Sequence, residues 1–85
     1  MDIFSPFRSE TFEEQAARHI EVKEATILNL AGAWRGSAII DLIKDASKYT
    51  VYSYSEYLAI TIVQLQQGLD PEIIIDHLLE DIRLA

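Results

Sequence analysis

The chain has 85 residues, 49% hydrophobic and 25% charged, with 14 acidic against 7 basic side chains and a formal net charge of −7. This length suits one domain, and the absence of cysteine excludes a disulfide scaffold, a cysteine-based zinc site and a thiol nucleophile. The acidic balance argues against binding to nucleic acid or to an anionic membrane surface, because like charges repel.

Residues 1–10 show no helical period, so we expect an extended N-terminal arm followed by a single helical domain over residues 11–85. Two large apolar residues of the arm, Phe4 and Phe7, are expected to fold back over the domain or to contact another subunit. The N-terminus lacks the pattern of a signal peptide, and the longest apolar stretch, residues 57–63, is far shorter than the roughly 20 residues of a membrane span. We therefore expect a cytoplasmic protein with no membrane contact.

The first helix is predicted from about Phe12 to about Trp34. It begins after Thr11, which with Glu14 three residues later has the pattern of a capping box. Apolar residues then recur at helical spacing and are expected to face the core. They are Phe12, Ala16, Ile20, Ile27 and Ala31, with Ala17, Leu28 and Trp34 beside them.

The second helix is predicted to be short, from Ala38 to Lys48. Gly32 and Gly36 bracket the connection before it, and Ser37 is a suitable N-cap. The residues expected to be buried are Ile39, Leu42, Ile43 and Ala46.

The third helix is predicted from Tyr54 to about Gln67. Ser53 and Glu56 form a second capping box, and Gly68 is expected to end the helix. Its apolar face comprises Tyr54, Leu58, Ile62 and Leu65, with Tyr57 beside them.

The fourth helix is predicted from Pro71 to about Arg83, because Asp70 is a favoured N-cap and proline fits the first helical position. It is expected to bury Ile74, Ile75, Leu78, Leu79 and Ile82. Short connections between four helices predict an all-α fold, a compact irregular bundle in which the third and fourth helices form a hairpin.

Catalytic patterns are missing from the sequence. His77 precedes Glu80 and Asp81 by three and four residues, but no H-E-x-x-H pattern, glycine-rich phosphate loop or nucleophile elbow occurs. A solvent-facing histidine beside acidic neighbours explains this set better than a metal site does. We expect no enzyme activity, no catalytic or metal-ligating residue and no cofactor.

The acidic residues concentrate in the last third of the chain. Residues 53–85 hold six acids and one base, so their net charge is −5, and Glu72, Asp76 and Glu80 follow one another at intervals of four. One interpretation is a solvated face that keeps the protein soluble. The other is a surface that binds a basic partner through Glu72, Asp76, Glu80 and Asp81.

All four tyrosines lie within nine residues of one another. Tyr49, Tyr52, Tyr54 and Tyr57 either close one end of the bundle or serve as apolar anchors for a partner, since tyrosine is enriched at binding hot spots. Trp34 and Arg35, in the glycine-bracketed connection, are candidate oligomer or ligand contacts.

In size and charge the chain resembles small acidic helical proteins such as bacteriocin immunity proteins and phage-encoded inhibitors, a likeness of composition that carries no site. Our hypothesis is a stoichiometric inhibitor or regulator of bacterial or phage type that binds a basic surface of a partner protein. A chain this small has little interior in which to bury so many apolar side chains. We therefore also expect a homo-oligomer, a dimer or higher, in which subunit contacts cover the remainder.

Two alternatives stay open. One is an oligomeric regulator whose helical hairpin contacts nucleic acid or a regulatory protein, which for nucleic acid requires Arg35, Lys44 and Lys48 to gather on one face. The other is an oligomer that sequesters a small ligand between subunits, using Trp34, Arg35 and the tyrosines.

Overall fold

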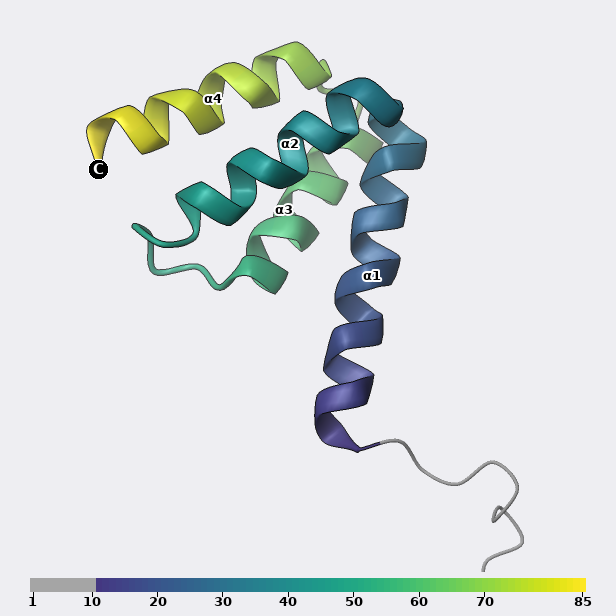
Figure 1. Cartoon of the computed structure of the whole chain (residues 1–85). Helices are drawn as coiled ribbons and strands as arrows, with labels where there is room; N and C mark the ends of the chain where they lie inside the picture. The colour runs from purple at the N-terminus through teal and green to yellow at the C-terminus, as the bar shows by residue number, and fades with distance from the viewer. Residues whose placement is uncertain (1–10) are drawn as a thin grey trace, which may run out of the picture.

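The computed structural model describes residues 11–85, which form four helices and no strand (Figure 1). The helices are α1 (Phe12–Ala31), α2 (Ala33–Ala46), α3 (Tyr54–Gln66) and α4 (Pro71–Leu84). The prediction of an irregular all-α bundle is confirmed. The expected N-terminal arm, with Phe4 and Phe7, lies outside the described residues.

The central helix of the bundle is α2. It packs against all three other helices, whereas α3 packs chiefly on α1, and α4 packs chiefly on α2. Figure 1 shows α1 running past one end of the other helices, with α4 and α3 on either side of α2.

Short polar motifs begin three of the helices, as the sequence predicts. Thr11 and Glu14 exchange hydrogen bonds of 3.1 and 2.8 Å at the start of α1. Ser53 and Glu56 do the same at 3.2 and 2.9 Å before α3, and the bond that Glu56 accepts from the Ser53 backbone lowers the pKa of this carboxyl. Asp70 accepts the N–H of the residue two positions later at 2.9 Å.

The turn after α3 is a Schellman motif. Gly68 has a φ of 91°, a conformation that glycine adopts without strain. The Gly68 N–H donates to the carbonyl of Leu65, and the Leu69 N–H donates to the carbonyl of Gln64, both at 3.0 Å. The predicted role of Gly68 is confirmed.

The boundary between the first two helices was predicted wrongly. α1 ends at Ala31 and α2 begins at Ala33, so Gly32 alone makes the turn, with a φ of 92°. Trp34 and Ser37 therefore lie inside α2, and Ser37 is not its N-cap; α2 ends at Ala46, two residues before the predicted end. The reason is that Gly32 suffices to reverse the chain, and residues 33–37 then continue as helix.

Gly36 has a packing role in place of the predicted turn. It is buried, and a Cβ built on it would lie 2.9 Å from the Leu28 Cα and 3.1 Å from the Ile27 carbonyl oxygen. The backbones of α1 and α2 therefore approach each other closely here, and this contact sets the sharp corner between them.

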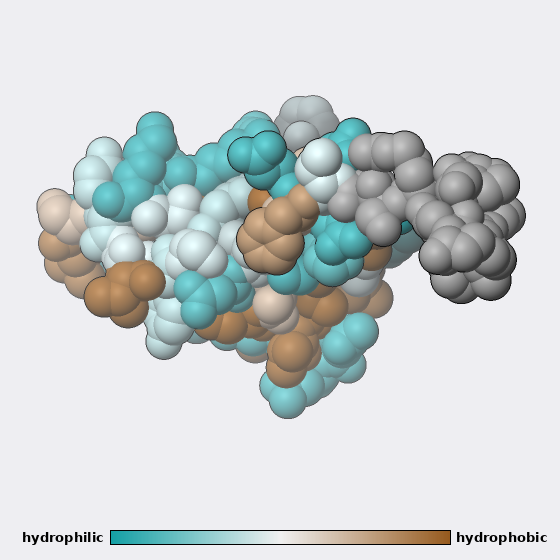
Figure 2. Space-filling view, turned by 90° about the horizontal axis from the view of Figure 1, so that it is seen from below, coloured by the Kyte–Doolittle hydropathy of each residue, from teal (hydrophilic) through white to brown (hydrophobic). Residues whose placement is uncertain are grey.

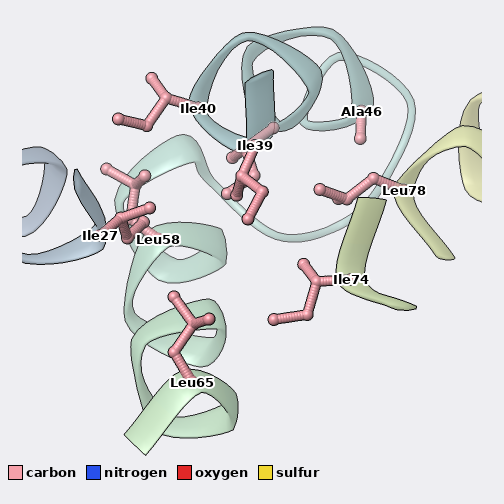
Figure 3. Packing of buried hydrophobic residues seen from close by; sticks show 9 residues of the cluster. Ile27, Ile39, Ile40, Ala46, Leu58, Leu65, Ile74 and Leu78 are labelled. Atoms are coloured by element: carbon pink, nitrogen blue, oxygen red, sulfur yellow. The ribbon is translucent and has the colours of Figure 1, made fainter. Parts of the chain in front are cut away.

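The core consists of apolar side chains from all four helices, which meet between α2 and its neighbours (Figure 3). The buried cluster comprises Ile27, Ile39, Ile40, Ile43, Ala46, Leu58, Leu65, Ile74 and Leu78. One polar residue, Thr61, is buried with them, and its hydroxyl donates to the Tyr57 carbonyl at 2.9 Å.

Six residues expected to be buried or to flank a buried face are exposed: Phe12, Ala16, Ala17, Leu28, Trp34 and Leu79. Phe12 and Ala16 lie on the first turns of α1, which extend beyond the other helices (Figure 1), and the Phe12 side chain is 86% exposed. Trp34 is 87% exposed because α2 begins before it and turns it away from the core. Leu79 is half exposed, since α4 has one packed face only. Figure 2 shows apolar side chains interspersed among polar ones on the face seen from below.

Candidate partner-binding groove

A groove separates α3 from α4. The two helices are joined by the tight turn at Gly68, but each packs mainly on a different helix, so they diverge from the turn. The groove has a volume of about 310 Å³ and is partly open to solvent. It is lined by Tyr52, Tyr57, Ile60, Thr61, Gln64, Ile74, His77, Leu78 and Asp81.

Helical spacing explains which side chains line the groove. In α3, Tyr57 and Thr61 are four residues apart, as are Ile60 and Gln64; in α4, Ile74 and Leu78 have this spacing, as do His77 and Asp81. Residues four apart lie on one side of a helix. Thr61, Ile74 and Leu78 are buried and form the floor, while the other residues rise toward solvent.

A hydrogen bond spans the groove at the end away from the turn. The Tyr57 hydroxyl donates to Oδ2 of Asp81 at 2.7 Å. The Tyr52 ring contacts that of Tyr57 edge to face, with centroids 6.1 Å apart and planes at 78°. Burial, the bond to Asp81 and the charge of Asp81 raise the pKa of Tyr57 from 10.0 to about 12, so its hydroxyl stays protonated and remains a donor near neutral pH.

Three of the predicted site residues, Tyr52, Tyr57 and Asp81, therefore meet in the groove, whereas the other two tyrosines do not. The Tyr54 hydroxyl donates to Glu24 of α1, and burial and this bond raise the pKa of Tyr54 above its ordinary range. Tyr49 is exposed in the connection between α2 and α3. Tyr54 thus joins two helices of the bundle.

The carboxylates of α4 differ in their partners. Glu72 accepts a hydrogen bond from Arg35 Nε at 2.5 Å, which ties the start of α2 to the start of α4. Glu80 pairs with Arg83 at 2.7 Å. Asp76 is exposed and has no partner among residues 11–85. Two of the four predicted acids are therefore neutralised by a cation of the same chain.

Trp34 lies at the opposite end of α2 from Tyr49 and Tyr52. A wide, open hollow of about 580 Å³ beside Trp34 is lined by Ala33, Trp34, Ser37, Ala38 and Asp41, all from α2. Trp34 is near the first residue of α2, whereas Tyr49 and Tyr52 follow its last turn, so the 14-residue helix, about 20 Å long, lies between them. This hollow has a single helix for a wall and is shallower than the groove.

The basic residues of α2 do not form one surface. Arg35 and Lys44 are nine residues apart, about half a turn of rotation around the helix, so they lie on opposite sides of α2. Lys48 pairs with Asp45 at 3.6 Å. Within residues 33–48, the basic face that nucleic-acid binding would require is therefore not assembled.

Sequence reasoning missed Ile60, Thr61, Gln64 and His77 as groove residues. The signal that would find them is the series of pairs at intervals of four on both helices of the hairpin. Of the set that the sequence places together on α4, His77 and Asp81 both line the groove, whereas Glu80 does not. No group of three or more histidine, aspartate or glutamate side chains in residues 11–85 is arranged to hold a metal ion.

Comparison of the chain with protein-family models, with curated proteins and with solved structures gives no match. Across residues 11–85, none of the helices is both long enough and apolar enough to cross a bilayer.

Proposed function

We propose that the protein is a stoichiometric inhibitor or regulator without enzyme activity that binds a basic surface of one partner protein through the α3–α4 groove and the adjoining face of α4. The observation that carries the proposal is the groove itself, where aromatic and aliphatic side chains border the most acidic helix. Such a combination of apolar anchor sites and a polar rim is typical of protein interfaces.

The charges of α4 support a basic partner. Helix α4 carries Glu72, Asp76, Glu80 and Asp81 against one base, Arg83. Asp76 has no cation among residues 11–85, and Asp81 is bound by a neutral hydroxyl, so the negative charge of both is available to a partner. Complementary charge raises the association rate and sets specificity, and its effect falls with salt.

Charge reversal tests this proposal directly. Tagged wild-type protein is used to capture partners from a nuclease-treated lysate of the producing cells at low and high salt, and the retained proteins are identified by mass spectrometry. The proposal predicts one partner with a basic surface that is lost at high salt and is not retained by the Asp76→Lys/Glu80→Lys variant. Both positions are exposed, so circular dichroism should show unchanged helical content.

A matched control separates the α4 surface from net charge. Glu13→Lys/Glu21→Lys makes the same change in net charge on exposed positions of α1, which does not line the groove. This control should retain the partner. Equal loss in both variants would mean that overall charge governs binding, and retention by both would refute a role for the acidic face.

Self-association is a second candidate, favoured by the outer face of α3. This helix has one charged residue, Glu56, yet Ile60 and Val63 are exposed. An apolar helix left uncovered on one side is typical of an interface. Light scattering coupled to size-exclusion chromatography should show a dimer or higher oligomer that Val63→Lys dissociates; a monomer at every concentration would refute this candidate.

A further inference from the structure

The groove has a specific polar character that limits what can occupy it. Its volume of about 310 Å³ is at the lower end of the range for ligand pockets, so it suits one large side chain better than a drug-sized molecule. Among its lining residues, Asp81 is the one carboxylate, and neither lysine nor arginine is present. The occupant that this charge favours is a cation.

The carboxylate of Asp81 has free acceptor capacity. Tyr57 occupies Oδ2 at 2.7 Å, whereas an ionised carboxylate offers about four lone-pair sites on its two oxygens. Because the Tyr57 hydroxyl holds the carboxylate, an incoming donor meets a fixed acceptor and the complex loses less side-chain entropy on binding. Asp81 is therefore positioned to accept a further charge-assisted hydrogen bond.

The rings beside Asp81 discriminate between kinds of cation. Tyr52 and Tyr57 both line the groove at the end where Asp81 lies. A guanidinium group is planar, weakly hydrated and able to stack on aromatic rings while its edge binds a carboxylate, whereas an ammonium group is compact and strongly hydrated. The Gln64 side-chain oxygen, on the α3 wall, adds a neutral acceptor.

The arginines of the described helices α2 and α4 are already engaged elsewhere. Arg35 is paired with Glu72, and Arg83 is paired with Glu80. Neither lines the groove. Among residues 11–85, no lysine or arginine lines the groove, so the described part of the chain supplies no cation to it.

We infer that the α3–α4 groove binds an arginine side chain of the partner protein, with the guanidinium on Asp81 and against the rings of Tyr52 and Tyr57, and its apolar stem against Ile60. This inference rests on the proposed function and specifies its anchor residue.

The test uses capped single amino acids and the full-length chain. Amide NMR spectra are recorded during titration with N-acetyl-arginine methylamide, and in parallel with the citrulline analogue, which has nearly the same shape but no charge. Saturable shifts of Tyr57, Gln64 and His77 signals are expected with arginine, with at least tenfold weaker binding of citrulline. The capped lysine derivative should also bind more weakly than arginine.

Two isosteric variants locate the charge that matters. Asp81→Asn keeps an acceptor for the Tyr57 hydroxyl and should weaken arginine binding at least tenfold. Glu21→Gln, on an exposed position of α1, removes the same charge far from the groove and should leave binding within twofold of wild type.

Three outcomes would overturn the inference: no saturable shift with arginine, equal binding of arginine and citrulline, or equal effects of the two variants. Stronger binding of lysine than of arginine would identify an ammonium site and would also overturn it. None of these results would change the outcome of the charge-reversal capture, so failure of the arginine anchor is distinguishable from failure of the proposed function.

Discussion

Replacing Gly36 by alanine tests the corner between α1 and α2. An alanine Cβ would lie 2.9 Å from the Leu28 Cα, 3.0 Å from Leu28 Cδ2 and 3.1 Å from the Ile27 carbonyl oxygen. Two of these three atoms belong to the backbone, so rotation of a side chain cannot relieve the overlap. The helices must move apart and disturb the contacts of Ile27 and Ile39 in the core.

The magnitude follows from two opposing effects. Overpacking of a tight contact costs about 1–3 kcal/mol, and a contact with backbone atoms belongs in the upper half of this range. Alanine is favoured over glycine inside a helix by about 0.5–1 kcal/mol. The Gly36→Ala variant should therefore lose about 1–2.5 kcal/mol of stability, which for a domain of this size lowers Tm by about 4–20 °C.

Thermal unfolding followed by circular dichroism measures this effect. Ser37→Ala is the matched control, because Ser37 is the next residue of the same helix and is exposed, so it should melt at or slightly above the wild-type Tm. A Gly36→Ala protein as stable as wild type, or more stable, would refute the close approach of the two helices and restore a turn role for this glycine.

Three further predictions concern stability and proton binding. Leu58 is 0% exposed in the centre of the core, so Leu58→Ala should cost about 2–5 kcal/mol in chemical denaturation, whereas Ile60→Ala in the exposed groove wall should cost far less; equal costs would contradict the core assignment. Asp70→Ala removes the side-chain hydrogen bond that caps α4 and should lower the free energy of unfolding by about 1 kcal/mol in the same measurement. Full retention of stability would show that Pro71 at the first helical position is enough to begin the helix without this cap. Because the pKa of Tyr57 is about 12 in the folded chain and 10.0 is its ordinary value, the unfolded chain loses this proton first, so stability should fall as pH rises from about 10 to about 12. Asp81→Ala removes both the acceptor and the charge, so phenolate absorbance should show one tyrosine titrating at lower pH in this variant than in wild type; an unchanged titration would refute the bond between the two residues.

Local chemistry made some features predictable from sequence. The capping boxes at Thr11 and Ser53, the cap at Asp70 and the turn at Gly68 each depend on a few adjacent residues, and all four lie where the sequence placed them. The buried residues of α2 and α4 follow largely from helical spacing, although the spacing did not predict the burial of Ile40.

Long-range packing decided the features that were missed. Gly32 and Gly36 both lack a Cβ. The local sequence does not distinguish a glycine that is needed for a positive φ from one that is needed because the backbone of another helix passes close to it. The apolar face of α1 includes Phe12 by helical spacing, but no other described helix reaches far enough along α1 to cover this side chain. The groove exists because α3 and α4 pack on different neighbours, a choice that no local pattern encodes.

Site-specific photo-crosslinking tests the central claim, that the α3–α4 groove is the surface that meets a partner, most directly. A photoreactive amino acid replaces Gln64 on the groove wall in one strain and Glu21 on exposed α1 in another, and adducts formed in intact producing cells are identified by mass spectrometry. We predict one dominant adduct from position 64, joined to the partner within a basic surface beside an arginine, and none from position 21. Adducts from position 21 alone, or equally from both positions, would contradict the assignment of the groove.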